Sequence, residues 1–254
     1  MVFDQDNFSS SYSQMYDKKV RINKANKGIA VIKEFLKDTK NLNLLDLGCS
    51  TGIMTNEYAK NFQKTIGIDI DESAIKFANN NYKDHNLEFL NYSHNDKRLK
   101  NEMFDVITCT HIYEHVESPE ALMNSVYRLL KPGGVCYFVA GNRYKIVEPH
   151  FKLPFLSFFN PNISKLYIKL FNKKGEYYQK HLSLFKLRKL VDQFRIYDYT
   201  LETIKKPEKY FSNDLVKDKT LSQKIYLLLG RVFYFMIPTY IWILKKETIN
   251  KDYL

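Results

Sequence analysis

The chain has 254 residues, of which 44% are hydrophobic, and its 39 lysines and arginines outnumber 28 acidic residues to give a formal net charge of +11. This length and apolar content suit a single α/β domain with a sizeable core. Three cysteines without C-x-x-C spacing exclude a disulfide framework, and we expect buried thiols in a reducing compartment. The polar first twenty residues predict no signal peptide, so a cytoplasmic protein is expected.

The first predicted elements are a helix over residues 16–38, a buried strand over residues 44–47 and a helix over residues 53–62. A tight turn with Gly48 and Gly52 joins the strand to the second helix. Glycine allows the backbone to turn sharply and a ligand to approach where a Cβ would collide. A strand–loop–helix unit of this kind is where open α/β sheets bind nucleotide-like ligands.

The glycine spacing excludes two common nucleotide sites. The dinucleotide fingerprint G-x-G-x-x-G would need glycines at 48, 50 and 53, but the chain has Gly48, Ser50 and Ile53. A phosphate-binding P-loop would need Gly-Lys-Ser or Gly-Lys-Thr, which does not follow Gly52.

A second strand is predicted over residues 65–70 and a third over residues 87–92. The second strand contains Asp69, 21 positions after Gly48, where a carboxylate can hold a pair of ribose hydroxyls. Asp69 could instead only cap the helix that starts near Glu72.

A further buried strand is predicted over residues 103–109, and the segment THIYEHV (residues 110–116) follows it. Ser118 as cap and Pro119 in the first turn open a helix that is expected to run to Leu130. The sequence KPGG after it should end the helix before a fifth strand over residues 135–140.

These motifs, in this order, resemble the class I S-adenosylmethionine-dependent methyltransferases of the small-molecule, type 11/12-like kind, over roughly residues 40–145. The glycine turn matches the pattern (D/E)-x-G-x-G-x-G at Asp46, Gly48 and Gly52, with Ser50 at the middle glycine. The resemblance implies an α/β, Rossmann-like, seven-stranded and mostly parallel sheet with helices on both faces. It also implies that a last strand, TYIWIL (residues 239–244), lies antiparallel beside strand five.

The implied cofactor is S-adenosyl-L-methionine. The family usually carries an acidic residue after strand three that accepts a hydrogen bond from the adenine amino group; here that position falls near Ser93, with Asn95 the nearest amide and Asp96 the nearest carboxylate. The residues predicted to bind the cofactor are Asp46, Gly48, Cys49, Ser50, Gly52, Asp69, Ile70, Asp96 and Thr110.

Methyl transfer mainly requires that the acceptor be aligned behind the methyl group, and an oxygen acceptor of high pKa also needs a base. His111 is one candidate base, because family residues just past strand four line the transferred methyl. His150 is the other, with Glu148 two positions earlier to orient it. Either histidine could instead be structural. His115 is expected to be structural in the turn that caps the next helix. His181 could touch the pocket, but nothing local supports such a role. No metal site is predicted.

We expect one methyltransferase domain over residues 1–254. A helical lid precedes the cofactor-binding core, an aromatic-rich insertion follows strand five, and a helix (182–194), a strand (197–204), a helix and a last strand complete the chain. The expected bounds of the four parts are residues 1–41, 42–140, 141–181 and 182–254.

The apolar stretch over residues 225–244 resembles a membrane span, but Arg231 near its centre and Pro238 argue against one. An apolar stripe at helical spacing predicts a helix instead: Leu221, Ile225, Leu228, Val232 and Phe235. Its other face is also apolar, at Tyr226, Leu227, Phe233 and Tyr234, which favours a helix lying on a membrane surface.

Residues 164–206 carry eleven Lys or Arg residues against four Asp or Glu residues. This segment could meet nucleic acid, anionic lipid or a phosphorylated substrate, or simply be a solvated surface. We expect peripheral contact with an anionic membrane, on its inner face, and no nucleic-acid partner, since no RNA-binding module is visible.

The favoured function is methyl transfer to a small acceptor, such as a lipid-linked molecule or a sugar, and O-methylation is the favoured reaction. Segments around Asn142, His150 and Leu153 resemble small-molecule methyltransferases of polysaccharide and lipid-linked sugar biosynthesis, and the absence of an Asn-Pro-Pro-Tyr motif after strand four argues against nucleobase nitrogens. An RNA or protein methyltransferase and a non-catalytic interaction domain of the same fold are the alternatives.

Overall fold

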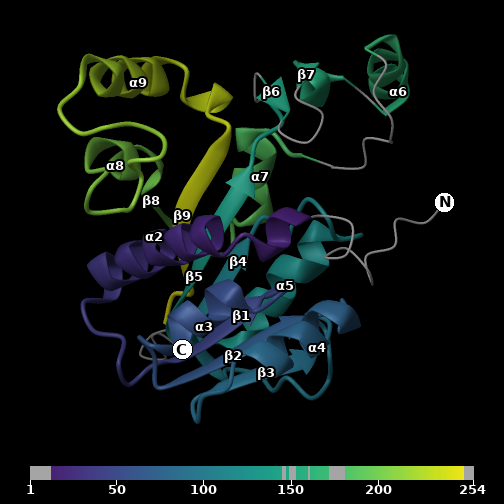
Figure 1. Cartoon of the computed structure of the whole chain (residues 1–254), viewed down its shortest axis with the longest axis vertical. Coiled ribbons are helices and arrows are strands. Elements are labelled where there is room, and N and C mark those ends of the chain that lie inside the picture. The colour runs from purple at the N-terminus through teal and green to yellow at the C-terminus, as the bar shows by residue number, and fades with distance from the viewer. Residues whose placement is uncertain (1–12, 145–146, 149–152, 160, 172–180, 249–254) are drawn as a thin grey trace, which may run out of the picture.

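The computed structural model describes residues 13–144, 147–148, 153–159, 161–171 and 181–248 (Figure 1). Seven strands form one sheet in the order β3-β2-β1-β4-β5-β9-β8. Strands β1 to β5 pair in parallel, and β9 lies antiparallel between β5 and β8. The strands are β1 (Asn43–Leu47), β2 (Lys64–Asp69), β3 (Leu87–Asn91), β4 (Phe104–Thr110), β5 (Leu130–Gly141), β8 (Arg195–Asp198) and β9 (Thr239–Lys245).

The helices are α2 (Lys18–Leu36), α3 (Ile53–Ala59), α4 (Glu72–Asn81), α5 (Pro119–Leu129), α6 (Pro161–Leu170), α7 (Leu184–Leu190), α8 (Thr200–Lys205) and α9 (Leu221–Val232). Of these, α2 and α3 pack against one face of the sheet, and α5 and α7 pack against the other. Successive side chains of a strand point to opposite faces, so the side chains of β5 pack into two hydrophobic cores, one on each face of the sheet. Cys136 and Phe138 pack with α5 and α7, whereas Tyr137 and Val139 pack with α2 and α3. The predicted Rossmann-like fold is confirmed.

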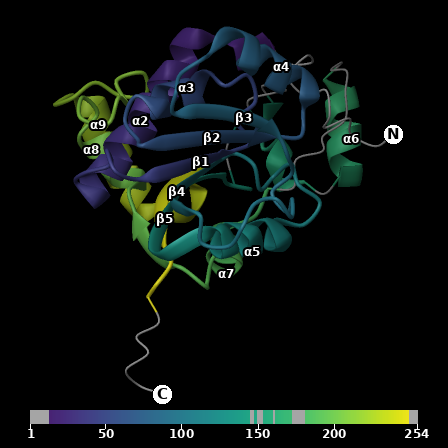
Figure 2. The same ribbon diagram turned by 90° about the horizontal axis from the view of Figure 1, so that it is seen from below.

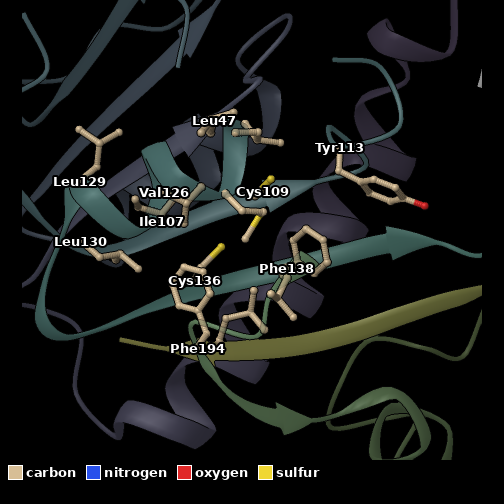
Figure 3. Close-up of a cluster of buried hydrophobic side chains, with 14 of the residues drawn as sticks. Leu47, Ile107, Cys109, Tyr113, Val126, Leu129, Leu130, Cys136, Phe138 and Phe194 are labelled. Carbon is tan, nitrogen blue, oxygen red and sulfur yellow. The ribbon is translucent and has the colours of Figure 1, made fainter. Parts of the chain in front are cut away.

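The first of these cores is the one drawn in Figure 3. Side chains of β4 and β5 interleave there with those of α5, and Phe194 closes the cluster beyond α7. All three cysteines are free and buried, as predicted, with Cys109 and Cys136 inside this core. Apolar side chains thus fill the space on this face of the sheet, so we expect a ligand to bind at the ends of the strands.

Two of the predicted strands differ clearly from the observed ones. The strand expected over residues 197–204 ends at Asp198, because the Asp198 Oδ1 accepts from the Thr200 N–H at 2.9 Å and turns the chain into α8. Strand β5 begins at Leu130, not at Val135, because KPGG bulges out of the ladder rather than preceding it. Gly133, with φ +78°, makes this bulge possible.

Residues after β5 form a hairpin and a short helix. Strands β6 (Val147–Glu148) and β7 (Leu153–Pro154) pair antiparallel, and the 3-10 helix η3 (Leu156–Phe158) and α6 follow. Figure 1 shows α6 and α9 at the same end of the molecule, on either side of this hairpin. In the described parts of the chain, no helix combines the length and apolar content needed to cross a bilayer.

Candidate active site

The glycine turn lies over the carboxyl end of β2. The backbone N–H groups of Gly48 and Cys49 both donate to the Ile68 carbonyl, at 2.9 and 3.0 Å. Gly48, Ser50 and Gly52 have φ values of +75°, +48° and +76°. Left-handed backbone is easy for glycine, and Ser50 adopts it as an exception. The backbone amides of Gly48 and Cys49 thus fix the turn to the carboxyl end of β2.

Asp69 ends β2 directly beside this turn. Its Oδ2 accepts from the Ser50 N–H at 2.7 Å and its Oδ1 from the Asp71 N–H at 2.9 Å. Burial raises the pKa of Asp69, and the two backbone donors partly oppose that shift. The cap of α4 is Asp71, whose Oδ1 accepts from the Ala74 N–H at 3.0 Å. Asp69 therefore does not cap this helix, and its carboxylate remains a ribose candidate.

Asp46 lies beneath the turn rather than at its surface. Thr55 of α3 and Thr108 of β4 donate their hydroxyls to the two oxygens of Asp46, at 2.6 and 2.5 Å. Burial raises the pKa of Asp46 to about 6, against the effect of these two hydrogen bonds. Asp46 thus joins three elements under the site, and its predicted part in binding is indirect.

Arg21 of α2 is a site residue that the sequence reasoning missed. Its guanidinium contacts the thioether sulfurs of Met15 and Met54, the latter at 3.6 Å. Burial lowers the pKa of Arg21, while the nearby carboxylates of Asp46 and Asp69 raise it. Thioethers are weak acceptors, so this cation has capacity left for an anionic ligand group. A basic residue on a helix of many lysines had no distinguishing local signal.

The segment before α2 also contacts the glycine turn. The Thr51 hydroxyl donates to the Met15 carbonyl at 2.8 Å. Met15 belongs to the 3-10 helix η2 (Ser13–Tyr16), which continues into α2 after one residue. The predicted helix over residues 16–38 therefore starts two residues later than expected, and its leading turn lies against the loop.

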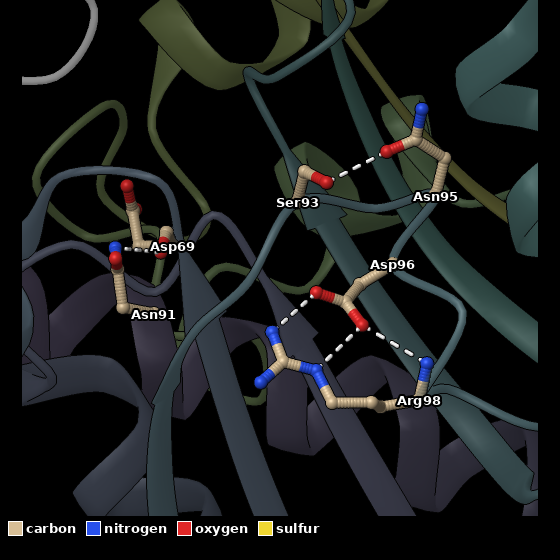
Figure 4. A network of polar contacts seen from close by, with 6 residues as sticks. All are labelled: Asp69, Asn91, Ser93, Asn95, Asp96 and Arg98. Atoms are coloured by element: carbon tan, nitrogen blue, oxygen red, sulfur yellow. Dashed lines mark hydrogen bonds and ion pairs between the residues drawn. The ribbon is translucent and has the colours of Figure 1, made fainter.

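The loop after β3 contains the residues predicted to lie near the adenine, Ser93, Asn95 and Asp96 (Figure 4). Asn91 donates through Nδ2 to the carbonyls of Asp69 and Ile70, at 3.0 and 2.9 Å, which ties β3 to the end of β2. Asp96 is turned toward Arg98, with Nε and Nη2 at 2.9 and 2.6 Å from its oxygens. These bonds hold the pKa of Asp96 at about 2. Contact between Asp96 and an adenine stays a prediction.

His111 and Glu114 form a pair just past β4. The Nδ1 of His111 lies 3.0 Å from the Oε1 of Glu114, and the Glu114 side chain is buried while that of His111 is partly exposed. His111 has a φ of +57° and donates its backbone N–H to the Val139 carbonyl at 2.9 Å. Burial alone would raise the pKa of Glu114, but the hydrogen bond from His111 and the charges of His111, His181 and His115 hold it below its ordinary value.

His181 approaches the same pair from a distant part of the chain. A Cβ built on Gly141, at the end of β5, would lie 2.8 Å from the His181 Cε1 and 3.3 Å from the Glu114 Oε1. The Tyr113 hydroxyl fixes this arrangement by donating to the Gly141 carbonyl at 2.5 Å and accepting from the Leu182 N–H at 3.0 Å. A side chain at position 141 would therefore require the imidazole of His181 to shift.

Three buried polar atoms at this edge have no hydrogen-bond partner among the residues that the structure describes: the Ser50 Oγ, the Thr110 Oγ1 and the Glu114 Oε2. Burying a polar group without a partner is unfavourable by roughly 1–3 kcal/mol. A polar ligand at the ends of β1 and β4 would satisfy such atoms. The residues present therefore fit a nucleoside-like cofactor.

The sequence-predicted residues thus divide into three groups. The first group, Gly48, Ser50 and Asp69, lies at the ends of β1 and β2. The second group, Thr110 and His111, lies at the end of the neighbouring strand β4. The remaining residues form the third group. Cys49 is buried, with the pKa of its thiol raised by burial, and contributes its backbone. His150 lies outside the described residues. No group of three or more His, Cys, Asp or Glu side chains in the described ranges is arranged to hold a metal ion.

Glu114 and His181 were missed for different reasons. Glu114 stands three positions after His111, a spacing that brings side chains together in a turn, so its pairing could have been anticipated. His181 is 70 positions beyond His111, and no local pattern connects the two.

Comparison with known proteins agrees with this geometry. Residues 45–138 match the model of a methyltransferase domain family. Ubiquinone biosynthesis O-methyltransferases of Coxiella burnetii (strain RSA 493 / Nine Mile phase I) and Psychrobacter cryohalolentis are both 34% identical to the chain, over 107 and 105 residues. Those matches span 41% and 39% of this chain and 45% and 41% of the relatives, so the chain spans less than half the length of these curated relatives.

Solved structures share the fold over most of the chain. The plantazolicin methyltransferase BpumL in complex with SAH has a TM-score of 0.58 at 21% identity, over 94% of this chain and 89% of that one. A complex between the Haloferax volcanii Trm112 methyltransferase activator and a methyltransferase gives 0.61 at 13% identity, over 97% and 100%. Residues 45–138 therefore match a methyltransferase domain, as the motifs predicted, and the chain has the fold of these solved methyltransferases.

Proposed function

We propose that the protein transfers a methyl group from S-adenosylmethionine to a hydroxyl group of a small, lipid-linked or sugar acceptor. The observation that carries this proposal is the shared edge of the sheet. There the glycine turn with Asp69 lies at the ends of β1 and β2, and the His111–Glu114 pair lies at the end of β4. The group proposed to bind the cofactor and the group proposed to remove the proton thus lie at the ends of neighbouring strands.

The cofactor side of the edge has a group for each polar part of the ligand. The turn from Gly48 to Gly52 would lie against the ligand with its backbone, and the Asp69 carboxylate would accept from ribose hydroxyls. Arg21 would pair with the carboxylate of the methionine portion. When bound, S-adenosylmethionine supplies a methyl group already activated by its sulfonium.

The acceptor side has the parts of a general base. An ionised Glu114 can only accept a hydrogen bond, so the Nδ1 of His111, 3.0 Å from it, would carry the proton, and the neutral imidazole would then have its lone pair on Nε2. Glu114 is held ionised by its lowered pKa, which favours this tautomer. His111 can then take the proton of an acceptor hydroxyl through Nε2 as the new C–O bond forms. An oxygen acceptor needs such a base, whereas a carbon or amine acceptor does not.

The class of acceptor is inferred from the relatives of the chain rather than from the geometry of the site. Relatives that are 34% identical over 107 residues are named as ubiquinone biosynthesis O-methyltransferases, which agrees with a hydroxyl on a lipid-soluble molecule. RNA and protein acceptors are tested as alternatives below.

Calorimetric titration with S-adenosylmethionine and with S-adenosylhomocysteine is the first test, and we expect both to bind. Quinols, phenols, lipid-linked sugars, short RNAs and proteins are then compared by formation of S-adenosylhomocysteine. Turnover with a hydroxylated small molecule supports the proposal. Failure to bind either nucleoside contradicts it, as does turnover with RNA or protein alone.

A further inference from the structure

Helix α9 contacts α8 through one polar residue, Gln223, and one small residue, Gly230. Gln223 donates through Nε2 to the carbonyls of Ile204 and Lys205 at the end of α8, at 3.0 and 3.2 Å. A Cβ built on Gly230 would lie 2.8 Å from the Leu201 Cδ2. Residues seven positions apart share a helix face, so Gln223 and Gly230 define the inward face of α9.

The outward side of α9 is apolar, the reverse of an ordinary surface helix. Leu221, Leu228 and Val232 expose 72%, 63% and 62% of their surface. Five further large side chains of α9 and the following 3-10 helix η4 (Tyr234–Met236) are exposed to about half: Ile225, Tyr226, Leu229, Phe233 and Phe235. A contiguous exposed apolar surface marks an interaction site. The stripe predicted from the sequence therefore faces away from the core.

Helix α6 repeats this arrangement on the other side of the β6–β7 hairpin. Its buried residue Ile168 packs with Leu153 and Leu156, while Leu166 and Leu170 expose 68% and 75% of their surface. Ile163 and the next residue after the helix, Phe171, are also exposed. Both helices are thus fastened by a narrow inward face and turn large apolar side chains to solvent.

The carboxyl edge of the sheet connects α9 to the candidate active site. Asn142, which follows β5, donates through Nδ2 to the carbonyls of Phe235 and Ile237, at 2.7 and 2.8 Å. Its neighbour Gly141 contacts His181 and approaches Glu114. The exposed helix therefore lies at the end of the molecule where the site lies. Figure 1 shows α6 and α9 at the same end of the molecule, and Figure 2 shows them at opposite margins, with the strands between them.

The charges on α6 and α9 indicate which kind of partner can bind this surface. Neither α6 nor α9 contains an acidic residue, and no Asp or Glu occurs between Asp218 and Glu247. The exposed charges of the two helices are all positive: Lys165, Lys169, Lys224 and Arg231. A second copy of the chain would bring like charges together, whereas an anionic bilayer takes both the basic and the apolar side chains.

We propose that α6, α9 and η4 form a docking surface for an anionic lipid bilayer. Their apolar side chains enter the boundary between headgroups and acyl chains, and their lysines and arginine contact lipid phosphates. Docking itself needs no catalytic activity. Resting on the proposed function, it would present the active-site end to acceptors dissolved in or anchored to the membrane.

Cosedimentation of the full chain with vesicles tests this surface. We expect binding to vesicles of phosphatidylcholine with phosphatidylglycerol, weak binding to phosphatidylcholine alone, and loss of the difference at high salt. The L228Q/V232Q double variant should bind at least about tenfold more weakly, because two apolar side chains no longer enter the bilayer. The matched L228M/V232I variant keeps apolar side chains and should bind like the parent protein.

The charge contribution has its own pair of variants. K165Q/K169Q should weaken binding to anionic vesicles about fivefold or more per lysine at low salt. Lys76, an exposed lysine of α4, provides the control K76Q/K83Q with a second exposed lysine after the same helix. This control should leave binding near the parent value.

Three results would overturn the proposal: protein that stays in the supernatant with anionic vesicles at low salt, equal binding by the L228Q/V232Q and L228M/V232I variants, or a dimer in the absence of lipid that L228Q/V232Q converts to a monomer. The last result would assign the surface to a second copy of the chain. Calorimetry with S-adenosylmethionine on the same variants separates this test from that of the proposed function, since exposed changes on α9 leave cofactor binding intact.

Discussion

The two halves of the site edge are built in different ways. On the cofactor side, Ser50 and Asp69 meet through a backbone N–H, and both lie within 22 residues of Gly48. On the acceptor side, Glu114 interacts with the side chain of His111 and, electrostatically, with that of His181, which comes from a distant part of the chain. The first half depends on main-chain conformation, and the second depends on tertiary packing.

This difference has a functional consequence. A turn held by backbone amides can bind the constant part of a reaction, the cofactor, with little dependence on the surrounding loops. An acceptor pocket must vary between enzymes, and loops placed by a rigid scaffold vary most easily. We therefore expect variants of the two halves to separate binding from turnover.

The largest effect is expected on the acceptor side. His111→Ala should lower turnover with a hydroxyl acceptor about 10²- to 10⁴-fold, because the proton then lacks a positioned base. Affinity for S-adenosylmethionine should stay at the parent value. Rates of S-adenosylhomocysteine formation and calorimetry measure the two quantities on the same samples.

His150→Ala completes this test, because the sequence also predicts a base there. If both single variants and the double variant keep near-normal rates, no histidine acts as the base and a carbon or amine acceptor follows. Glu114→Gln should lose turnover with His111 intact, and a shifted pH profile would distinguish positioning of His111 from general unfolding.

A second prediction concerns Asp46, which joins both halves through Thr55 and Thr108. Its pKa of about 6 lies above the ordinary carboxyl value, so the folded state binds the proton more tightly than the unfolded state. Stability from this group is present at low pH and is lost as pH rises from about 4 to above 6. The free energy of unfolding of the parent protein should therefore fall relative to Asp46→Asn by about 3 kcal/mol over that range.

Chemical denaturation of the parent and Asp46→Asn proteins at a series of pH values measures this difference. Parallel pH curves for the two proteins would contradict the assignment and would place the titration elsewhere.

The smallest effect is expected on the cofactor side. Asp69→Ala should weaken binding of S-adenosylmethionine by about 1–3 kcal/mol, since the backbone donors of Ser50 and Asp71 and the ribose hydroxyls lose their acceptor. Asp38→Ala is a matched control, because Asp38 is an exposed aspartate accepting a backbone N–H outside the site. Unchanged affinity of Asp69→Ala in calorimetry would overturn the ribose assignment.

Much of the cofactor side could be predicted from the sequence. The glycine turn, the strand that ends at Asp69 and the cap at Ser118 depend on neighbours a few residues away, and backbone preferences act at that range. Resemblance to a methyltransferase family added a seven-stranded, mostly parallel sheet and the antiparallel place of β9 beside β5. Strand β8 was placed wrongly at its end because the turn at Asp198 competes with apolar alternation.

The sequence by itself determined the fold class and the position of the glycine turn, because hydrophobic periodicity and turn residues act locally. Only the tertiary structure brought Arg21 beside Asp69, His181 beside Glu114 and the apolar side of α9 to the surface. The stripe on α9 has the same spacing whether it faces the core or solvent. Which side is buried depends on the contact that α8 makes with Gln223 and Gly230, and helical periodicity carries no information about that contact.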